Sequence, residues 1–343
     1  MKVHPLVSNV DILSTLVTFV PEERYLFFAL VCSSWRLSWC LHRRNFLTRA
    51  ITPYTSASQL QYGFKLGLQK SFEVSRAIAE LGNLELLQVA RESGCPWDYR
   101  TCGAAAQAGH LHIVQWVRQN GCPWNGWVCA RAALGGHLDI LKWLRENGCP
   151  WDGLTGAGAA EGGHVSVLLW ARDNGMPWDD WTCAGAAEGG HLDLLQWLRA
   201  KGCPWSAVTC RRAAKQGHLE LLQWARSMGC PWDKFVCISA AGGGHLEVLQ
   251  WCRENGCEWD SFTCSSAAEG GHLEVLMWAR ANGCDWDSLT CSRAAEHGHL
   301  EVLQWARANG CPWDSQVCTG AAAGGHKDVL QWAQEHGCPR HYC

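Results

Sequence analysis

One segment recurs along most of this chain at a fixed step, and this repetition limits what the chain can fold into. The copy from Gly298 to Asp314 reads Gly-His-Leu-Glu-Val-Leu-Gln-Trp-Ala-Arg-Ala-Asn-Gly-Cys-Pro-Trp-Asp. Tryptophans mark its copies at steps of 27 residues, at Trp97, Trp124, Trp151, Trp178, Trp205, Trp232, Trp259, Trp286 and Trp313. Histidines keep the same step, at His110, His137, His164, His191, His218, His245, His272, His299 and His326. A period of roughly 20–50 residues is typical of a solenoid, in which each unit packs on its neighbours.

Each unit of the repeat contains the signals of two helices joined by a tight turn. In one unit, Asp287 or Ser288 can cap a first helix that runs through residues 290–295, because a short side-chain oxygen accepts from the first free N–H groups. Gly298 supplies the backbone freedom that the turn requires. A second helix over about residues 300–308 is apolar on more than one face, as expected of a helix packed on both sides. We therefore predict an all-α protein, an α-solenoid of stacked helix-turn-helix repeats.

The same residues resemble an ankyrin repeat. Residues 294–303 match the pattern Ala-Ala-x-x-Gly-His-x-Glu-Val-Val, and Gly310-Cys311 matches Gly-Ala. The resemblance recurs in register over residues 72–343. Ankyrin units are about 33 residues long, and the roughly six residues missing here follow Asp314, where ankyrin repeats carry a β-hairpin finger. The resemblance implies a retained helix pair, a finger reduced to a turn, and a monomeric, non-enzymatic module for protein–protein interaction.

Residues 1–50 differ from the repeats that follow. A helical stretch with Leu13 and Leu16, a Pro-acidic turn and an apolar helix precede Val-Cys-x-x-Trp-Arg, which begins at Val31 and includes Trp35. This order resembles an F-box. The resemblance implies that these four residues contact a Skp-type adaptor, and that the chain recruits substrates to an SCF-type cullin–RING ubiquitin ligase. The alternative is a helical cap on a plain ankyrin-repeat scaffold or host-factor-binding protein.

The chain is thus expected to have three parts, which differ in charge. They are the F-box-like segment 1–50, a linker or degenerate repeat over 51–71, and the ankyrin-like array 72–343. The formal charge is −3. Up to Arg76, nine Lys and Arg against four Asp and Glu give +5, which leaves twenty against twenty-eight, or −8, for the remainder. An acidic array lacks the basic face of a nucleic-acid binder.

Neither a secretory signal nor a membrane span is evident in the sequence. The apolar run over residues 10–20 lacks the charged start and the cleavage site of a signal peptide. No stretch approaches the roughly 20 apolar residues that cross a bilayer. We expect a protein of the cytoplasm, with the nucleus as the other compartment, that binds no membrane and no nucleic acid.

Most of the 21 cysteines fall into two further ladders. One ladder is Cys95, Cys122, Cys149, Cys203, Cys230, Cys257, Cys284, Cys311 and Cys338, and the other is Cys102, Cys129, Cys183, Cys210, Cys237, Cys264, Cys291 and Cys318. Helices stacked about 8–10 Å apart hold equivalent cysteines beyond the ~7 Å limit for a disulfide. Met176 and Gly156 each replace one member, which a packing site tolerates. We interpret the cysteines as buried, reduced thiols, with metal binding or redox sensing as the alternative.

The repeated tryptophans and histidines are also interpreted as structural. Two ladders hold eighteen of the 22 tryptophans, and each buried indole removes about 150–250 Å² from water. Trp305 and its equivalents are expected between second helices, and Trp313 and its equivalents in the shortened loop. The alternative is an exposed aromatic ladder for sugars or peptides. We expect each repeated histidine to bond a neighbouring turn, and the sequence supplies no catalytic, metal or cofactor site.

Recognition is best sought where the copies differ. Seven apolar residues occupy one position in successive first helices, and we call them the apolar strip: Trp127, Leu154, Trp181, Val208, Phe235, Phe262 and Leu289. We predict that the strip lies on the concave side and binds a protein partner, whereas the alternative is that it fills gaps between repeats. Arg131, Arg212 and Arg293 interrupt a nearby row of small residues. They would select an acidic partner, or they are scattered surface charge.

Overall fold

The chain forms one broad arc of helix pairs. The computed structural model describes residues 56–65 and 67–339, and these residues form 21 α-helices without a strand. The first is α5 (Ala57–Lys65). The first helices of the ten pairs are α6 (Phe72–Leu81), α8 (Tyr99–Gln107), α10 (Gly126–Leu134), α12 (Gly153–Glu161), α14 (Asp180–Glu188), α16 (Ala207–Lys215), α18 (Phe235–Gly243), α20 (Ser261–Gly270), α22 (Ser288–Glu296) and α24 (Gln316–Ala323). The second helices are α7 (Leu84–Glu92), α9 (Leu111–Gln119), α11 (Leu138–Glu146), α13 (Val165–Asp173), α15 (Leu192–Ala200), α17 (Leu219–Ser227), α19 (Leu246–Glu254), α21 (Leu273–Ala281), α23 (Leu300–Ala308) and α25 (Lys327–Glu335).

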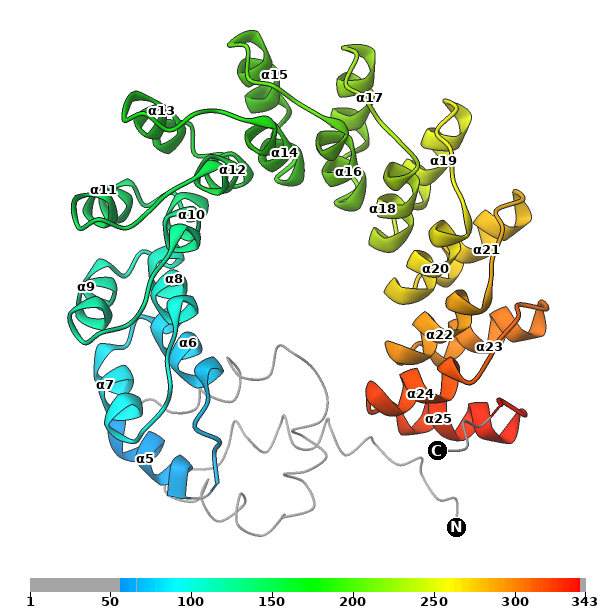
Figure 1. Ribbon diagram of the computed structural model, residues 1–343, viewed down its shortest axis with the longest axis horizontal. Helices are drawn as coiled ribbons and strands as arrows, with labels where there is room; N and C mark the ends of the chain where they lie inside the picture. The colour runs from blue at the N-terminus through cyan, green and yellow to red at the C-terminus, as the bar shows by residue number, and fades with distance from the viewer. Residues whose placement is uncertain (1–55, 66, 340–343) are drawn as a thin grey trace, which may run out of the picture.

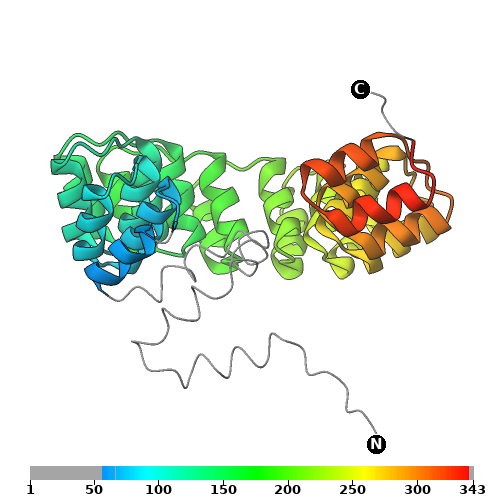
Figure 2. The ribbon, with the colours of Figure 1, turned by 90° about the horizontal axis from the view of Figure 1, so that it is seen from below.

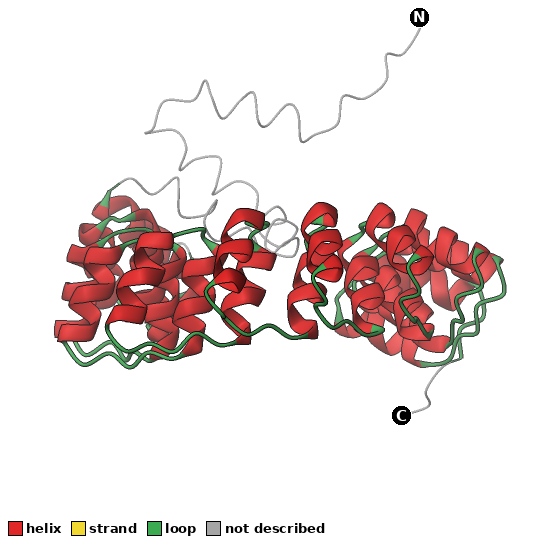
Figure 3. Ribbon diagram, turned by 90° about the horizontal axis from the view of Figure 1, so that it is seen from above, coloured by secondary structure: helices red, strands yellow, loops and turns green. Residues whose placement is uncertain are grey.

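First helices line the inner side of the arc and second helices its outer side (Figure 1). Seen edge-on, the arc is a single band of helix pairs, and the connections between units are short loops (Figures 2 and 3). The predicted all-α solenoid of ankyrin-like helix pairs is therefore confirmed. In the described residues a plain loop stands where an ankyrin repeat would carry its finger.

The limits of the helices follow from their capping residues. Asp287, and not Ser288, caps α22, since its carboxylate accepts from the Leu289 N–H at 3.0 Å. The first helix is longer than the predicted 290–295 and runs on to Glu296, because glutamate favours helix and nothing before it ends the helix. The second helix, α23, has the predicted limits, and a glycine with a φ of 82° follows it at Gly310.

The histidines lock the turn inside each neighbouring unit. His218 donates from Nε2 to the carbonyl oxygen of Glu188 at 3.1 Å, and its ring lies over Gly190, whose φ is 73°. Six other units repeat this bond at 2.9–3.1 Å, from His110, His137, His164, His191, His245 and His299. The predicted structural role of the repeated histidines is confirmed for these units.

Tryptophans and arginines bridge the second helices, which fan apart on the outer side (Figure 1). The guanidinium of Arg226 lies 4.1 Å from the ring centroid of Trp232 and donates to the Cys230 carbonyl. Trp232 meets Trp251 of the next second helix edge-on, with 5.8 Å between ring centroids. Nine units share the two ring contacts, and eight of them share the bond to the carbonyl. The loop tryptophans therefore fill the loops as predicted, and their packed rings favour the structural interpretation.

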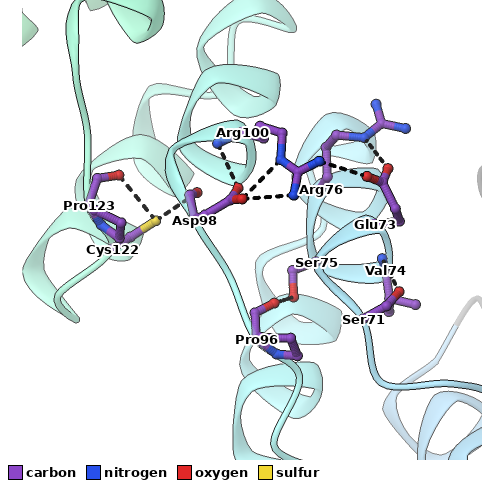
Figure 4. Close-up of polar contacts among 10 residues, drawn as sticks. All are labelled: Ser71, Glu73, Val74, Ser75, Arg76, Pro96, Asp98, Arg100, Cys122 and Pro123. Carbon is purple, nitrogen blue, oxygen red and sulfur yellow. Dashed lines mark hydrogen bonds and ion pairs between the residues drawn. The ribbon is translucent and has the colours of Figure 1, made fainter.

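The cysteine ladders are buried, with Cys318 half-buried, and they meet in a way that the sequence did not reveal. Within a unit, the thiol of the first-helix cysteine contacts the thiol of the cysteine twenty residues later, as in Cys291 and Cys311. The later thiol donates to a backbone carbonyl at the start of the unit, as Cys122 does to Asp98 at 3.2 Å (Figure 4). The two ladders thus connect the loop, the helix and the cap of one unit.

The amino-terminal end of the array is closed by α5. This helix packs against α7 and buries Leu60 completely. The predicted adaptor-binding residues Leu13, Leu16, Val31 and Trp35 lie outside the described residues. None of the described helices has the length and apolar character needed to cross a membrane.

Candidate functional site

The concave surface is built from four positions of each first helix. In α12 these are Leu154, Ala157, Gly158 and Glu161. The last three lie three, four and seven residues after Leu154, so all four share one helix face. The strip residue stands first in each set, so the seven residues of the apolar strip occupy equivalent places on successive inner helices (Figure 1).

The strip is exposed along much of its length. Leu154, Trp181, Phe235 and Phe262 expose 45, 42, 46 and 52% of their surface. The other three members, Trp127, Val208 and Leu289, are half-buried. Side chains that only filled gaps between units would be buried, so about half-exposed aromatic and aliphatic residues in one row favour a contact surface over gap filling alone.

A hollow of about 390 Å³ lies across α10, α12 and α14, and we call it the α10–α14 groove. It is lined by Trp127, Ala130, Arg131, Leu134, Leu154, Ala157, Gly158, Glu161, Trp181, Ala184, Gly185, Glu188 and Arg212. The groove brings together five of the predicted site residues, namely Trp127, Arg131, Leu154, Trp181 and Arg212. The remaining predicted residues, Val208, Phe235, Phe262, Leu289 and Arg293, lie farther along the array and do not line it.

The floor of the groove consists of alanines and glycines. A Cβ added at Gly158 would collide with the carbonyl oxygen of Ala130, and one at Gly185 with that of Ala157. Neighbouring inner helices approach closely at these two positions because no side chain separates them. The floor was missed in the sequence, although the two glycines stand where the flanking units carry arginine.

Arg131 is an unusual member of the groove. Its guanidinium lies 5.1 Å from the ring centroid of Trp127 and donates to the side-chain oxygen of Gln107. Its Nε is buried without a hydrogen-bond partner, and burial lowers the pKa of the guanidinium. Within the described residues it forms no ion pair. A buried donor without an acceptor is costly, and an acceptor from outside the chain would reach this Nε only if the side chain turned outward.

The other two predicted arginines already have carboxylate partners. Arg212 lies 2.8 Å from Glu188 and stands over the Trp181 ring at 5.8 Å. Arg293 lies 3.1 Å from Glu296. Their charges are therefore compensated within the array, which weakens the expectation that they select an acidic partner.

At the amino-terminal end of the strip, ion pairs replace the apolar side chains. Arg100, which occupies the strip position of α8, lies 2.9 Å from Asp98 and 3.2 Å from Glu73 (Figure 4). Glu73 also binds Arg76 at 2.8 Å. These exposed pairs offer little energy of their own, but they end the apolar surface before α8.

Comparisons with known proteins found a similar fold and no related sequence. No protein-family model matches the chain, and no curated protein matches it. Among solved structures, the chain is similar to the ankyrin repeat domain of human ASB11, with 17% sequence identity and a TM-score of 0.33 over 46% of this chain and 84% of that one. The fold described above rests on the ten helix pairs themselves.

Glu161 carries a charge that the fold does not favour. Burial raises the pKa of its carboxyl, and nearby Glu188 raises it further, while Arg131 and Arg212 lower it less. A carboxyl whose pKa is higher in the folded state costs stability once the pH exceeds its unfolded value of about 4.3. The groove thus contains an acidic group, Glu161, and a basic group, Arg131, neither of which forms an ion pair among the described residues.

Replacing Glu161 with glutamine should therefore raise the melting temperature at pH 7. The gain should disappear as the pH falls below about 4.3, where the carboxyl is protonated in both states. Circular dichroism melts at pH 4 and pH 7 measure this difference. Glu188→Gln is the control: it removes a like charge near Glu161 but also breaks the ion pair with Arg212, so it should gain less than E161Q at pH 7. A gain from E161Q that is equal at both pH values would contradict this explanation.

The groove presents indole faces, aliphatic side chains and balanced charges, which are features of recognition surfaces. Among residues 56–65 and 67–339, no group of three or more His, Cys, Asp and Glu side chains could hold a metal ion.

Proposed function

We propose that this chain is a non-enzymatic module that binds a protein partner through its concave face, with the apolar strip as the main contact. The observation that carries the proposal is the exposure of four strip residues by 42–52% along one line of inner helices. Solenoids create extended concave surfaces by stacking their units. Tryptophan is enriched among the residues that contribute most to binding, and both tryptophan and phenylalanine are enriched in the cores of protein interfaces.

An affinity capture of partners from cell lysate tests this proposal with two matched variants of the intact protein. The first replaces Trp127, Trp181, Phe235 and Phe262 with alanine and should lose the captured partners. The control replaces four exposed apolar residues of the outer side, Val165, Leu169, Met228 and Met277, with alanine. These expose 41, 41, 61 and 44% of their surface, so both variants remove similar apolar area. Partners retained by the strip variant and lost by the control would place recognition on the outer side instead.

We further propose that this binding serves an SCF-type cullin–RING ubiquitin ligase, with residues 1–50 as the part that holds a Skp-type adaptor. Support comes from the F-box-like order of Leu13, Leu16, Val31 and Trp35. In this proposal residues 51–71 connect that segment to the array 72–343. The protein then acts as a cytoplasmic monomer that brings its partner to the ligase.

Deleting residues 1–50 separates this proposal from its alternative. If the segment holds the adaptor, the full chain retains a purified Skp-type adaptor in a pull-down and the truncated chain does not, while partner binding is unchanged. If the segment only caps a plain scaffold, the deletion lowers the melting temperature and neither form retains the adaptor. Failure of the full chain to bind the adaptor would end the ligase proposal and leave the concave-face proposal standing.

A further inference from the structure

We propose that the α10–α14 groove takes an uncharged, proline-rich segment in the polyproline II conformation, laid along the arc so that it crosses α10, α12 and α14 in turn. The inference rests on the proposed function, since it names the kind of protein segment that the concave face recognises.

The general spacing of packed helices matches the pitch of such a segment. Packed helices lie about 8–10 Å apart, and the glycine contacts place the inner helices of this groove in close packing. Polyproline II rises about 3.1 Å per residue with three residues per turn, so one face recurs about every 9.3 Å. Every third residue of the segment would therefore meet one strip residue, first Trp127, then Leu154, then Trp181.

The surface of the groove suits a chain whose backbone is close to the protein. At Gly158 and Gly185 the space that a Cβ would fill is taken by the backbone of the preceding helix, so no side chain rises from the floor there. Trp181 and Leu154 expose 42 and 45% of their surface above that floor. Proline-rich segments dock in aromatic-lined grooves because their extended form is preformed and loses little freedom on binding.

The unpartnered donor in the groove distinguishes this segment from a helix. Polyproline II has no internal hydrogen bonds, so its backbone carbonyls are free to accept. The buried Nε of Arg131 has no acceptor among the described residues, and the indole N–H groups of Trp127 and Trp181 are donors without acceptor capacity. The backbone carbonyls of a helical partner already accept hydrogen bonds within their own helix. Such a partner would therefore leave the Nε of Arg131 without an acceptor.

The charges of the groove favour an uncharged occupant. Arg212 and Glu188 form an ion pair, and Arg131 and Glu161 add one charge of each sign, so the formal sum is zero. An acidic side chain near Arg131 would also face Glu161, and a basic one near Glu161 would face Arg131 and Arg212.

Fluorescence anisotropy with the full chain and two labelled dodecapeptides tests the inference. One peptide is (Pro-Ala-Ala)₄, with proline in every third position, and the other is (Pro-Ala)₆, which contains more proline in the wrong period. The first should bind saturably below about 1 mM and at least about fivefold more tightly than the second. Trp181→Ala and Leu154→Ala should each weaken its binding by about tenfold. Phe262→Ala, in the same strip but outside the groove, should leave it unchanged.

Three results would overturn the inference. They are equal or tighter binding of the period-two peptide, tighter binding of an acidic Ala-Glu peptide of the same length, and unchanged binding of (Pro-Ala-Ala)₄ by both groove variants. The affinity capture distinguishes failure of this inference from failure of the proposed function. If neither peptide binds but the strip variant loses its partners, the concave face binds protein in another form. If neither peptide binds and the strip variant keeps its partners, both proposals fall.

Discussion

Replacing Gly190 with alanine should lower the free energy of unfolding by about 1.5–3.5 kcal/mol. The residue has a φ of 73°, in the left-handed region, where a Cβ costs about 1–2 kcal/mol. That Cβ would also lie 2.6 Å from the ring of His218. The ring must move, and its hydrogen bond to the Glu188 carbonyl, now 3.1 Å long, is lost, which adds about 0.5–1.5 kcal/mol.

Gly202→Ala is a matched control within the same unit. Gly202 has a φ of 80°, but a Cβ there meets nothing within 4 Å. It should therefore cost the backbone penalty alone, about 1–2 kcal/mol. Urea unfolding followed by circular dichroism measures both variants. Equal losses would show that the histidine ring gives way freely and does not lock the turn.

The sequence alone predicted the features that depend on residues within one unit or that recur in the same place in every unit. The 27-residue step, the helix pair, the cap at Asp287 and the contact of each histidine with a neighbouring turn were all predictable, because each follows from a local signal that recurs in register. The end of α22 at Glu296 was not, since no residue before it marks the end of that helix.

The candidate site could be predicted only in part. Comparison of the repeats identified the strip residues and the row of small residues that Arg131 and Arg212 interrupt. It could not show that the hollow lies over only three of the inner helices, because its depth depends on Gly158 and Gly185 lying against the backbone of the preceding helix. Nor could it show that Arg212 has a carboxylate partner while Arg131 has none. Such pairings depend on distances between units, which a repeat pattern does not contain.

The two interruptions of the cysteine ladders give the second large effect. They seemed independent in the sequence, yet Gly156 and Met176 occupy the two positions that form a thiol pair in other units. A Cβ at Gly156 would lie 2.9 Å from the Met176 methyl carbon, and Met176 is almost completely buried. The long side chain thus takes the space that the absent one leaves.

A double-mutant cycle should reveal this exchange. Gly156→Cys alone overpacks the site against Met176 and should cost about 1–3 kcal/mol. Met176→Cys alone leaves a cavity beside Gly156 and should also cost about 1–3 kcal/mol. The double variant recreates the thiol pair of the neighbouring units and should return to within about 0.5 kcal/mol of the wild type, a coupling of at least about 1.5 kcal/mol. Urea unfolding under reducing conditions measures all four proteins.

The reverse exchange in the next unit checks that the coupling belongs to the pair of positions. Cys183→Gly with Cys203→Met should be tolerated better than either change alone, since those two thiols are in contact. Losses that simply add in both units would mean that each position packs independently, as the separate ladders first suggested. A strong coupling would instead show that each unit balances the size of its own two side chains. Single substitutions in this array would then be poor guides to which residues it requires.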